Sequence, residues 1–510
     1  MQRRAGGLLL IACLAACATN PGVIATEART ADSDSAGTTV VVDAPGTTGA
    51  PTDPSDTSPA SPSTTIPPGI PAGAQDDNGI GDALFPSLGN PGIDVEHYTL
   101  ALDYDPQRHQ ISATAHLDLV MTEDRSTFSL DSDGPVVSSV VVDGSPATFV
   151  AAQPELLITP GVPLTSGQRV GVDVTYTLSP EPIPSAAGQT VGWFTTPGGS
   201  YVLNEPEGAH TWIPCDDHPS DQATFRFELT VPTGLTAVAN GALIDHTSTA
   251  TTETWVWQED RPMATYLIQL LTGDYELVDG VGPNGLPLVS AVLREDRDTV
   301  QSYLDTIDDQ IDYFDDFFGP YPLDRYGIAI ADSVSGLAME TMGRSQFSRD
   351  DFSTGRLDYV QELLLSHELA HQWFGDAVSP SRWIDVWLNE SFATYGEWMW
   401  LDHAGVRTME DSASSGLTGR ESDATATPTA AAMFSFNRYD GGAVVLHALR
   451  KTIGDELFFT LMRRWVADNN GSSRTTEDFV ALANEVSGQD LTEFFATWLY
   501  ADVVPTTFPV

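Results

Sequence analysis

The sequence predicts a multidomain α+β protein, in which a β-sheet domain comes first and a mainly helical domain follows it. Two observations support this prediction. Hydrophobic residues alternate with a period of two in several short segments before about residue 281, and beyond it they recur every three or four residues. The length of 510 residues also exceeds what one hydrophobic core usually supports, so two folded domains are expected.

Residues 1–17 have the form of a signal peptide. Arg3 and Arg4 precede an apolar stretch that is too short to span a membrane. The ending Leu14-Ala15-Ala16-Cys17 resembles a bacterial lipobox, which implies cleavage before Cys17 and a lipid on its sulfur. We therefore expect export across the cytoplasmic membrane and lipid anchoring on the bacterial cell surface. The alternative is an ordinary signal peptide in which Cys17 is incidental.

Residues 18–83 are rich in Thr, Ser, Pro, Gly, Ala and Asp and contain few large apolar side chains. Such a segment cannot bury enough surface to offset the entropy lost on ordering it, so we expect a disordered tether. The part that follows contains one cysteine, Cys215, so no intrachain disulfide is expected there.

The formal net charge of -48 argues against nucleic-acid binding. Contact with phosphates requires clustered Lys and Arg, and this chain has a single lysine, Lys451. The acidic composition favours solubility in an extracellular setting. It also favours attraction of cationic substrates, such as peptides with a free amino terminus, inside a cleft where screening is weak.

Residues 84–282 are predicted to form the β domain, as a sandwich or a saddle-like sheet. In the segment Ile111–Met121 the odd positions are apolar and the even positions are mostly polar. The same alternation recurs in Val170–Leu178 and Ala223–Val231, with Gly, Pro and Asp turn residues between the segments.

Residues 283–510 are predicted to be mainly helical. One helix with a single buried stripe is expected before Gly319-Pro320, because apolar residues recur at helical spacing: Val300, Leu304, Ile307, Ile311, Phe314 and Phe318. Residues 410–431 form a polar stretch. The tail, residues 439–500, is predicted to be helical, with a candidate cap at Thr475 and breaks at Gly454 and Gly488.

A His-Glu-x-x-His pattern lies in this helical domain, at His367, Glu368 and His371. On a helix, residues four apart share a face, so both imidazoles can bind one metal ion. Glu368 lies one step round the helix, where it can hold a water molecule without binding the metal. Two nitrogen ligands, an open position for water and a separate base are what a hydrolytic zinc site needs.

Glu390 is the predicted third ligand. It follows His371 with eighteen residues between them, in a second periodic segment, residues 384–400, that ends before Gly405. Two antiparallel helices would return Glu390 to the histidines and leave one coordination position free. The sequence therefore predicts one Zn²⁺ per chain.

The metal pattern, its eighteen-residue gap and Trp387-Leu-Asn-Glu390 resemble family M1 of the zinc aminopeptidases (gluzincins), the group that contains aminopeptidase N and leukotriene A4 hydrolase. Three further blocks resemble the family: Pro214-Cys215, Phe318-Gly-Pro-Tyr-Pro322 and Tyr266-Leu-Ile-Gln-Leu-Leu-Thr-Gly-Asp-Tyr275. The likeness implies that the helical domain is a thermolysin-like zinc-metallopeptidase domain. It also implies a short form without the C-terminal helical domain of larger members, and hence a more open cleft.

The family's Gly-x-Met-Glu-Asn motif corresponds to residues 337–341, in which Leu337 and Thr341 replace the glycine and the asparagine. The resemblance implies that Glu340 binds the α-ammonium group of the substrate. The two replacements are expected to affect the backbone geometry beside the scissile bond more than the contact between Glu340 and the α-ammonium group. Taken alone, Glu340 is equally well a loop carboxylate.

Glu205 lies ten residues before Cys215, where the family has a Glu or Gln that also contacts the substrate amino terminus. The neighbouring Glu207 is the second choice. Two carboxylates at fixed distances from a metal ion would accept a charged amine and let only the first peptide bond reach the metal. A blocked amine would leave both carboxylates unpaired.

Tyr439 resembles the tyrosine of the family's Tyr-x-Lys-Gly-Ala block, whose hydroxyl donates to the developing oxyanion; Gly441 replaces the usual Lys or Arg. Without the resemblance, a tyrosine before two glycines is more simply a packing residue at a helix start. Asp376 and Asp385 are both candidates to orient a ligand imidazole, and the sequence does not choose between them.

These residues predict a zinc-dependent aminopeptidase that hydrolyses peptides with a free amino terminus, with Glu368 as general base and Tyr439 as oxyanion donor. Two alternatives stay open. A metalloendopeptidase with the same zinc site would also cleave N-acetylated peptides. A non-catalytic peptide-binding surface lipoprotein would hold zinc without hydrolysing aminoacyl dyes.

Overall fold

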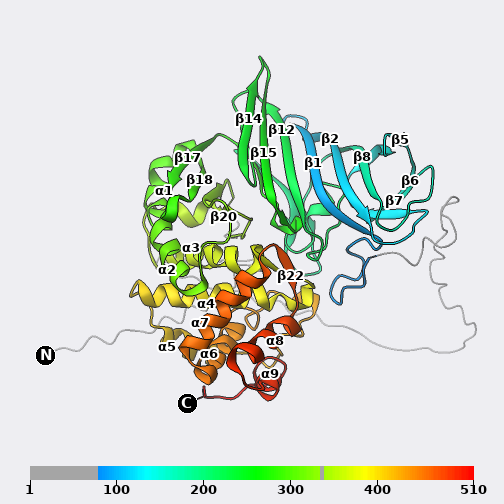
Figure 1. Cartoon of the computed structure of the whole chain (residues 1–510). Coiled ribbons are helices and arrows are strands. Elements are labelled where there is room, and N and C mark those ends of the chain that lie inside the picture. The colour runs from blue at the N-terminus through cyan, green and yellow to red at the C-terminus, as the bar shows by residue number, and fades with distance from the viewer. Residues whose placement is uncertain (1–78, 334–337, 510) are drawn as a thin grey trace, which may run out of the picture. The chain divides into compact units, whose positions relative to one another are not determined.

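The computed structural model describes residues 79–333 and 338–509, and many of its helices and strands are labelled in Figure 1. Cys17, the rest of residues 1–78, and Leu337 lie outside the described residues. Among the described residues, strands make up most of those before residue 294 and helices about half of those after residue 297, so the predicted order of a β-sheet region and a helical region is confirmed. Among the described residues, no helix combines the length and the hydropathy that a membrane span needs.

The β-sheet region contains three sheets. Its largest sheet has eight strands, in the order β14 (Ala242–Ser248), β15 (Thr252–Met263), β12 (Ala223–Pro232), β1 (Ile93–Asp105), β2 (Gln110–Met121), β8 (Arg169–Leu178), β4 (Val136–Val142) and β5 (Ser145–Pro146). A five-stranded sheet has the order β13 (Thr236–Ala239), β16 (Leu270–Gly273), β11 (Gly199–Leu203), β10 (Thr190–Thr196) and β9 (Ile183–Pro184). A three-stranded sheet has the order β3 (Phe128–Asp131), β7 (Glu155–Thr159) and β6 (Thr148–Ala152).

Burial alternates along the central strands β1, β2, β8 and β12 of the largest sheet, as the period of two predicts. On β2 one face is buried, at Ile111, Ala113, Ala115, Leu117 and Leu119. Strand β2 pairs antiparallel with β1 and β8, and β1 pairs parallel with β12. The apolar face is therefore continuous across neighbouring strands, which accounts for the alternation in the sequence.

A four-stranded sheet leads into the helical region. Its strands are β17 (Tyr275–Val281), β18 (Pro287–Leu293), β19 (Ile328–Ala331) and β20 (Ser345–Ser348). Strands β18, β19 and β20 pair parallel. Only Asp274 separates β16, in the five-stranded sheet, from β17. A short pair of strands, β21 (Val378–Pro380) and β22 (Ser472–Arg474), joins two later parts of the chain.

The described helices are α1 (Arg297–Leu304), α2 (Ile307–Phe318), α3 (Tyr359–His371), α4 (Trp387–His403), α5 (Met409–Gly419), α6 (Asp440–Ile453), α7 (Asp455–Asn469), α8 (Thr476–Ser487) and α9 (Thr492–Trp498). The single helix predicted before Gly319 is wrong, because α1 ends at Leu304 and α2 begins at Ile307. The Thr306 hydroxyl donates to the Tyr303 carbonyl at 2.8 Å, a local bond that competes with helix continuation.

The polar stretch 410–431 also contains a helix that the apolar pattern did not predict, α5. Thr408 caps it by accepting a hydrogen bond from the Asp411 backbone NH. In the tail the predicted cap and breaks are present: Thr475 forms a capping box with Asp478. Helix α6 ends before Gly454, and α8 ends before Gly488.

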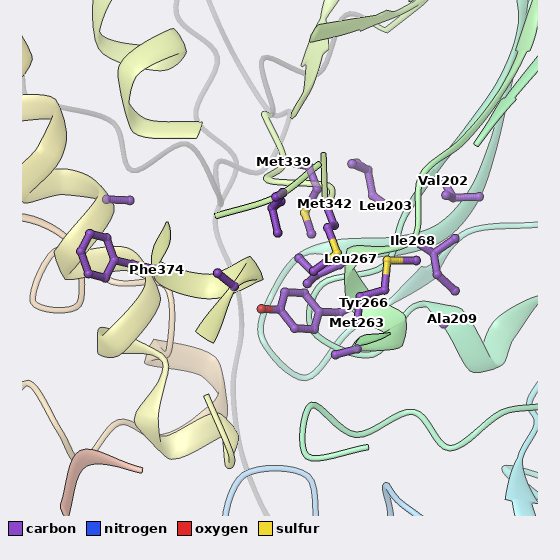
Figure 2. Packing of buried hydrophobic residues seen from close by; sticks show 14 of the residues in the cluster. Val202, Leu203, Ala209, Met263, Tyr266, Leu267, Ile268, Met339, Met342 and Phe374 are labelled. Carbon is purple, nitrogen blue, oxygen red and sulfur yellow. The ribbon is translucent and has the colours of Figure 1, made fainter. Parts of the chain in front are cut away.

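Buried hydrophobic residues of the β-sheet and helical regions belong to one core cluster. Figure 2 shows part of it, with Met263 and Tyr266 from the β-sheet region beside Met339 and Met342, and the Tyr266 hydroxyl on the side of Phe374. Two segments far apart in the chain, one from each region, are therefore packed together.

Candidate active site

Helix α3 carries both histidines of the His-Glu-x-x-His pattern. Asp358 caps the helix by accepting a hydrogen bond from the Val360 backbone NH at 3.2 Å. His367 and His371 lie one turn apart, and both are buried. Their Nε2 atoms are 3.1 Å apart, so the two rings converge on one point.

A wide π turn, Gln372–Asp376, follows His371 and redirects the chain. Gly375 has a φ of 132°, which favours glycine, and a Cβ there would lie 3.3 Å from Nδ1 of His371. The turn brings the Phe374 carbonyl to 3.1 Å from the same Nδ1. With Nδ1 as the donor, His371 presents the lone pair of Nε2 to the site.

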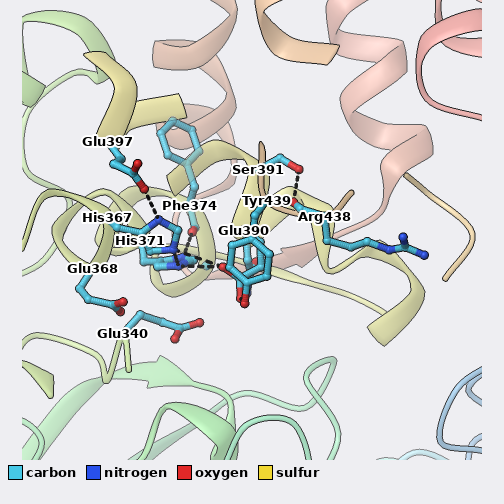
Figure 3. A network of polar contacts seen from close by, with 12 residues as sticks. Glu340, His367, Glu368, His371, Phe374, Glu390, Ser391, Glu397, Arg438 and Tyr439 are labelled. Carbon is cyan, nitrogen blue, oxygen red and sulfur yellow. Dashed lines mark hydrogen bonds and ion pairs between the residues drawn. The ribbon is translucent and has the colours of Figure 1, made fainter. Parts of the chain in front are cut away.

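Helix α4 brings Glu390 back to the histidines (Figure 3). Its Oε2 lies 3.3 Å from Nε2 of His367 and 3.4 Å from Nε2 of His371. Glu390 is buried as well. The structure therefore brings together the three residues predicted from the sequence as metal ligands, and they form a group able to hold a metal ion.

The three converging atoms fit a zinc ion. Tetrahedral ligands about 2.0–2.1 Å from zinc lie roughly 3.3–3.4 Å from one another. The separations here are 3.1, 3.3 and 3.4 Å. Two Nε2 lone pairs and a carboxylate that face one point repel each other. A cation bound between them would attract all three donors and offset this repulsion. Two imidazoles and one carboxylate are also a ligand set that catalytic zinc adopts.

Glu397 orients His367. Its Oε2 lies 3.3 Å from Nδ1 of His367, which leaves Nε2 of that ring for the metal. Glu397 follows Glu390 by seven residues, or two helical turns, so both carboxylates lie on the same face of α4. This spacing was a signal in the sequence that could have identified Glu397.

The prediction that Asp376 or Asp385 orients a ligand imidazole is wrong. Nδ1 of each histidine is occupied by another acceptor, Glu397 or the Phe374 carbonyl. Asp385 instead accepts hydrogen bonds from Arg382 and Thr476, and Asp376 is buried at the end of the π turn.

Glu368 lies beside the three ligands but outside their group. Its carboxylate groups with Glu340 and His371, with all three ligand atoms within 4.8 Å of one another. Figure 3 shows Glu340 and Glu368 on the same side of the histidine pair. Burial raises the pKa of Glu368 to about 8, and a cation held by the ligands would act in the opposite direction.

Tyr439 lies directly before α6. Its hydroxyl donates a hydrogen bond to Oε1 of Glu390 at 2.9 Å, and its ring centroid is 6.0 Å from that of His367. The phenol therefore lies beside two of the converging ligands, Glu390 and His367.

Close packing of α4 against α6 holds Tyr439 beside Glu390. A Cβ on Gly442 would lie 1.7 Å from Oγ of Ser391, so the two helices approach as closely as only glycine allows. The Ser391 hydroxyl donates to the Arg438 carbonyl at 2.5 Å. Since Ser391 follows Glu390 and Arg438 precedes Tyr439, this bond couples the positions of both functional side chains.

Glu205 and Glu340 are buried near the converging ligands, one from each region of the chain. Burial raises the pKa of Glu205 well above its usual range, and the carboxylates of Glu340 and Glu390 raise it further. Burial also raises the pKa of Glu340. A positive charge placed between the two carboxylates would lower both pKa values.

Glu207, the second choice for this role, is directed elsewhere. Its Oε1 accepts hydrogen bonds from the Ser185 hydroxyl at 2.8 Å and from the Ala186 backbone NH at 3.2 Å. These partners lie next to β9, in the five-stranded sheet. Of the two neighbouring glutamates, only Glu205 is electrostatically coupled to the residues around the metal ligands.

The site can thus carry out three kinds of chemistry. Three donors can bind a divalent cation, a separate buried carboxylate can accept and return a proton, and a phenol can donate a hydrogen bond. Two more carboxylates nearby favour a positively charged ligand group.

Two family models match the chain. The Peptidase M1 N-terminal domain matches residues 94–267, and the Peptidase family M1 domain matches residues 303–498. The first match covers strands of the β-sheet region, and the second contains all three converging metal donors.

Curated relatives are aminopeptidases by name. "Probable aminopeptidase 2" of Sulfurisphaera tokodaii is 28% identical over 447 residues, which are 82% of this chain and 54% of the relative. "Aminopeptidase M1-B" of Oryza sativa subsp. japonica is 28% identical over 330 residues, which are 60% of this chain and 37% of the relative. The chain therefore matches about half the length of these relatives, or less.

Solved structures of an M1 zinc metallopeptidase from Deinococcus radiodurans are similar over their whole length. One is 29% identical, with a TM-score of 0.75, and the match covers 85% of this chain and 100% of that chain. A mutant of the same enzyme bound to a Tyr-Ser-Ala substrate matches with a TM-score of 0.75, 29% identity and coverage of 85% and 99%.

We predict that Glu397→Gln lowers the affinity for zinc by about 10- to 100-fold, because a neutral amide makes the His367 ring a weaker base and orients it less firmly. Competition with a chelator of known affinity measures the change. Asp385→Asn is the matched control, since Asp385 bonds Thr476 and Arg382 and not a ligand. Equal affinity in Glu397→Gln and the unmodified chain would contradict the orienting role.

Proposed function

The chain belongs to peptidase family M1, and on that basis we propose that it is a zinc-dependent aminopeptidase that hydrolyses the first peptide bond of peptides with a free amino terminus. The main support is the convergence of Glu390 on His367 and His371, with Glu205 and Glu340 buried nearby. Either feature alone would leave the reaction or the choice of substrate end unexplained.

In this proposal His367, His371 and Glu390 hold one zinc ion per chain. When bound, zinc supplies a Lewis acid that polarises the scissile carbonyl and the attacking water. Glu397 and the Phe374 carbonyl keep the two imidazoles in the tautomer that leaves Nε2 available.

Glu368 acts as general base and then as general acid. It takes a proton from the attacking water and returns it to the nitrogen of the leaving amine. Glu368 is buried, so bulk solvent has little access to its carboxylate. Its position next to His367 on α3 holds it at the site. Tyr439 turns its hydroxyl from Glu390 to the developing oxyanion, which it stabilises by a hydrogen bond.

Glu340 and Glu205 bind the α-ammonium group. Both carboxylates are buried with raised pKa values, so they are poorly stabilised as a pair of anions. The substrate ammonium restores the balance of charge, whereas a neutral blocked terminus does not. The acidic chain as a whole favours the approach of such cationic peptides.

We predict that Glu368→Gln keeps zinc but lowers kcat by about 10²–10⁴-fold, because the amide cannot accept the proton. Glu390→Ala, in contrast, should lose zinc, since two imidazoles alone bind it weakly. Metal analysis and release of aminoacyl fluorophores measure the two properties. Glu362→Gln is the control on the same helix, since Glu362 bonds Trp400 away from the ligands. Near-native turnover by Glu368→Gln would refute the mechanism.

We predict that N-acetylation of a peptide substrate lowers kcat/KM by roughly 10²–10³-fold, since it removes the charge that both carboxylates need. Glu340→Gln and Glu205→Gln should each lower kcat/KM for the free peptide. Glu207→Gln should not, because Glu207 bonds Ser185 and Ala186. Equal cleavage of acetylated and free peptides would instead identify a metalloendopeptidase.

We also propose that the chain is exported and held on the bacterial cell surface by a lipid on Cys17. Arg3-Arg4, the apolar stretch that follows and Leu14-Ala15-Ala16-Cys17 support this, together with the long polar segment after Cys17. The catalytic part would then act on peptides outside the cytoplasm.

We predict that Cys17→Ser moves the expressed chain from the detergent-rich to the aqueous phase in a phase-separation assay, because the thiol that carries the lipid is lost. Cys13→Ser, four residues earlier in the same segment, should leave the partition unchanged. An aqueous partition of the unmodified chain would contradict lipid anchoring.

A further inference from the structure

The block Tyr266–Tyr275 stands out in the sequence, but the proposed chemistry assigns it no role. We infer that its first four residues, Tyr266–Gln269, set the spacing between the metal ligands and the two carboxylates that bind the substrate amine. Tyr266 and Gln269 are then positioning residues. The inference rests on the proposed aminopeptidase function and specifies how the chain selects the first peptide bond.

Tyr266 is attached to both segments that carry metal ligands. Its hydroxyl donates to the Gly375 carbonyl at 3.2 Å, in the π turn that follows His371. The same oxygen accepts a hydrogen bond from Nδ2 of Asn389, the residue before Glu390, at 3.1 Å. Burial raises the pKa of Tyr266 well above its usual range, so the hydroxyl stays protonated and keeps donating.

Ile268 is attached to the segment that carries Glu205. Nδ2 of Asn204, the residue before Glu205, donates to the Ile268 carbonyl at 3.1 Å. Oδ1 of Asn204 accepts a hydrogen bond from the Trp212 indole at 2.9 Å, which fixes the amide orientation. Asn204 is buried, so both bonds are shielded from water.

Gln269 is attached to the turn that follows Glu340. Its Nε2 donates to the Thr341 hydroxyl at 2.8 Å and to the Arg344 carbonyl at 2.7 Å. The Thr341 hydroxyl in turn donates to that carbonyl at 2.5 Å. The side chain at position 341 therefore holds the turn through hydrogen bonds, although it is not the asparagine of the family motif.

The Arg344 side chain holds this turn in place by donating three hydrogen bonds. They run to Oε1 of Gln269 at 2.9 Å, to the Ala239 carbonyl at 2.8 Å and to the Val289 carbonyl at 2.7 Å. Its guanidinium also lies 5.1 Å from the ring centroid of Trp257. Burial lowers the pKa of Arg344 to about 10, which still leaves it cationic at neutral pH and a strong donor.

One short segment therefore contacts the neighbours of Glu390, Glu205 and Glu340, and touches none of the reacting atoms itself. Gln269 is completely buried and Tyr266 nearly so, which keeps the segment rigid. Figure 2 shows Tyr266, Leu267 and Ile268 inside the packed cluster beside Met339 and Met342. A substitution in this segment should therefore change the distance between the amine-binding carboxylates and the metal ligands, without removing either group.

Substrates that differ only in the length between amine and carbonyl test this inference. Glycyl and β-alanyl p-nitroanilide differ by one methylene in that length. We expect the unmodified chain to prefer the glycyl compound. Tyr266→Phe and Gln269→Met should lower the glycyl-to-β-alanyl ratio of kcat/KM by about tenfold, the effect expected for a lost buried hydrogen bond. Zinc content and circular dichroism should not change.

Tyr313→Phe is the matched control. The Tyr313 hydroxyl donates to the Met399 carbonyl of α4 at 2.9 Å, so this variant also loses a hydrogen bond to the helix of Glu390. It lies outside Tyr266–Gln269 and should leave the ratio unchanged.

Two results would overturn the inference. If both variants lower kcat/KM for the two substrates equally, Tyr266 and Gln269 stabilise the fold without setting the spacing, and the aminopeptidase proposal stands. If the unmodified chain cleaves N-acetylated peptides as well as free ones, the proposed function fails and the inference fails with it.

Discussion

Repulsion among buried carboxylates is the constraint on which the rest of the site depends. Six acidic side chains gather around two histidines in a region shielded from water: Glu205, Glu340, Glu368, Asp376, Glu390 and Glu397. At low local dielectric such a cluster is unfavourable unless cations enter it. The cluster therefore favours two cations, a metal ion among the converging ligands and an ammonium group between the outer carboxylates.

Rigid packing allows the fold to maintain this unfavourable cluster. The ligands sit on two helices, α3 and α4, joined through a π turn that only a glycine at 375 allows. Helix α6 lies against α4 with no room for a side chain at Gly442. The β-sheet region adds Glu205 and the buried segment around Tyr266, so neither region supplies the whole site.

Local spacing in the sequence is sufficient to predict the metal ligands, because helix geometry brings residues at that spacing close together. His367 and His371 are four residues apart on one helix, and the period of the second segment placed Glu390 on the next. Tyr439 and Glu205 could be named only through resemblance to a family, because no local pattern relates residues brought together by tertiary contacts. The break at Thr306 and helix α5 were missed because side-chain bonds to the backbone, not apolar periodicity, determine them.

The two histidines are held in different ways. His367 bonds a carboxylate, which a single nucleotide change can neutralise or remove, whereas His371 bonds a main-chain carbonyl that every residue at position 374 would provide. One imidazole is thus open to electronic tuning during evolution, and the other is protected from it. Natural variation in metal affinity among chains of this kind should therefore accumulate at the position of Glu397, while the backbone around Phe374 stays constant in shape.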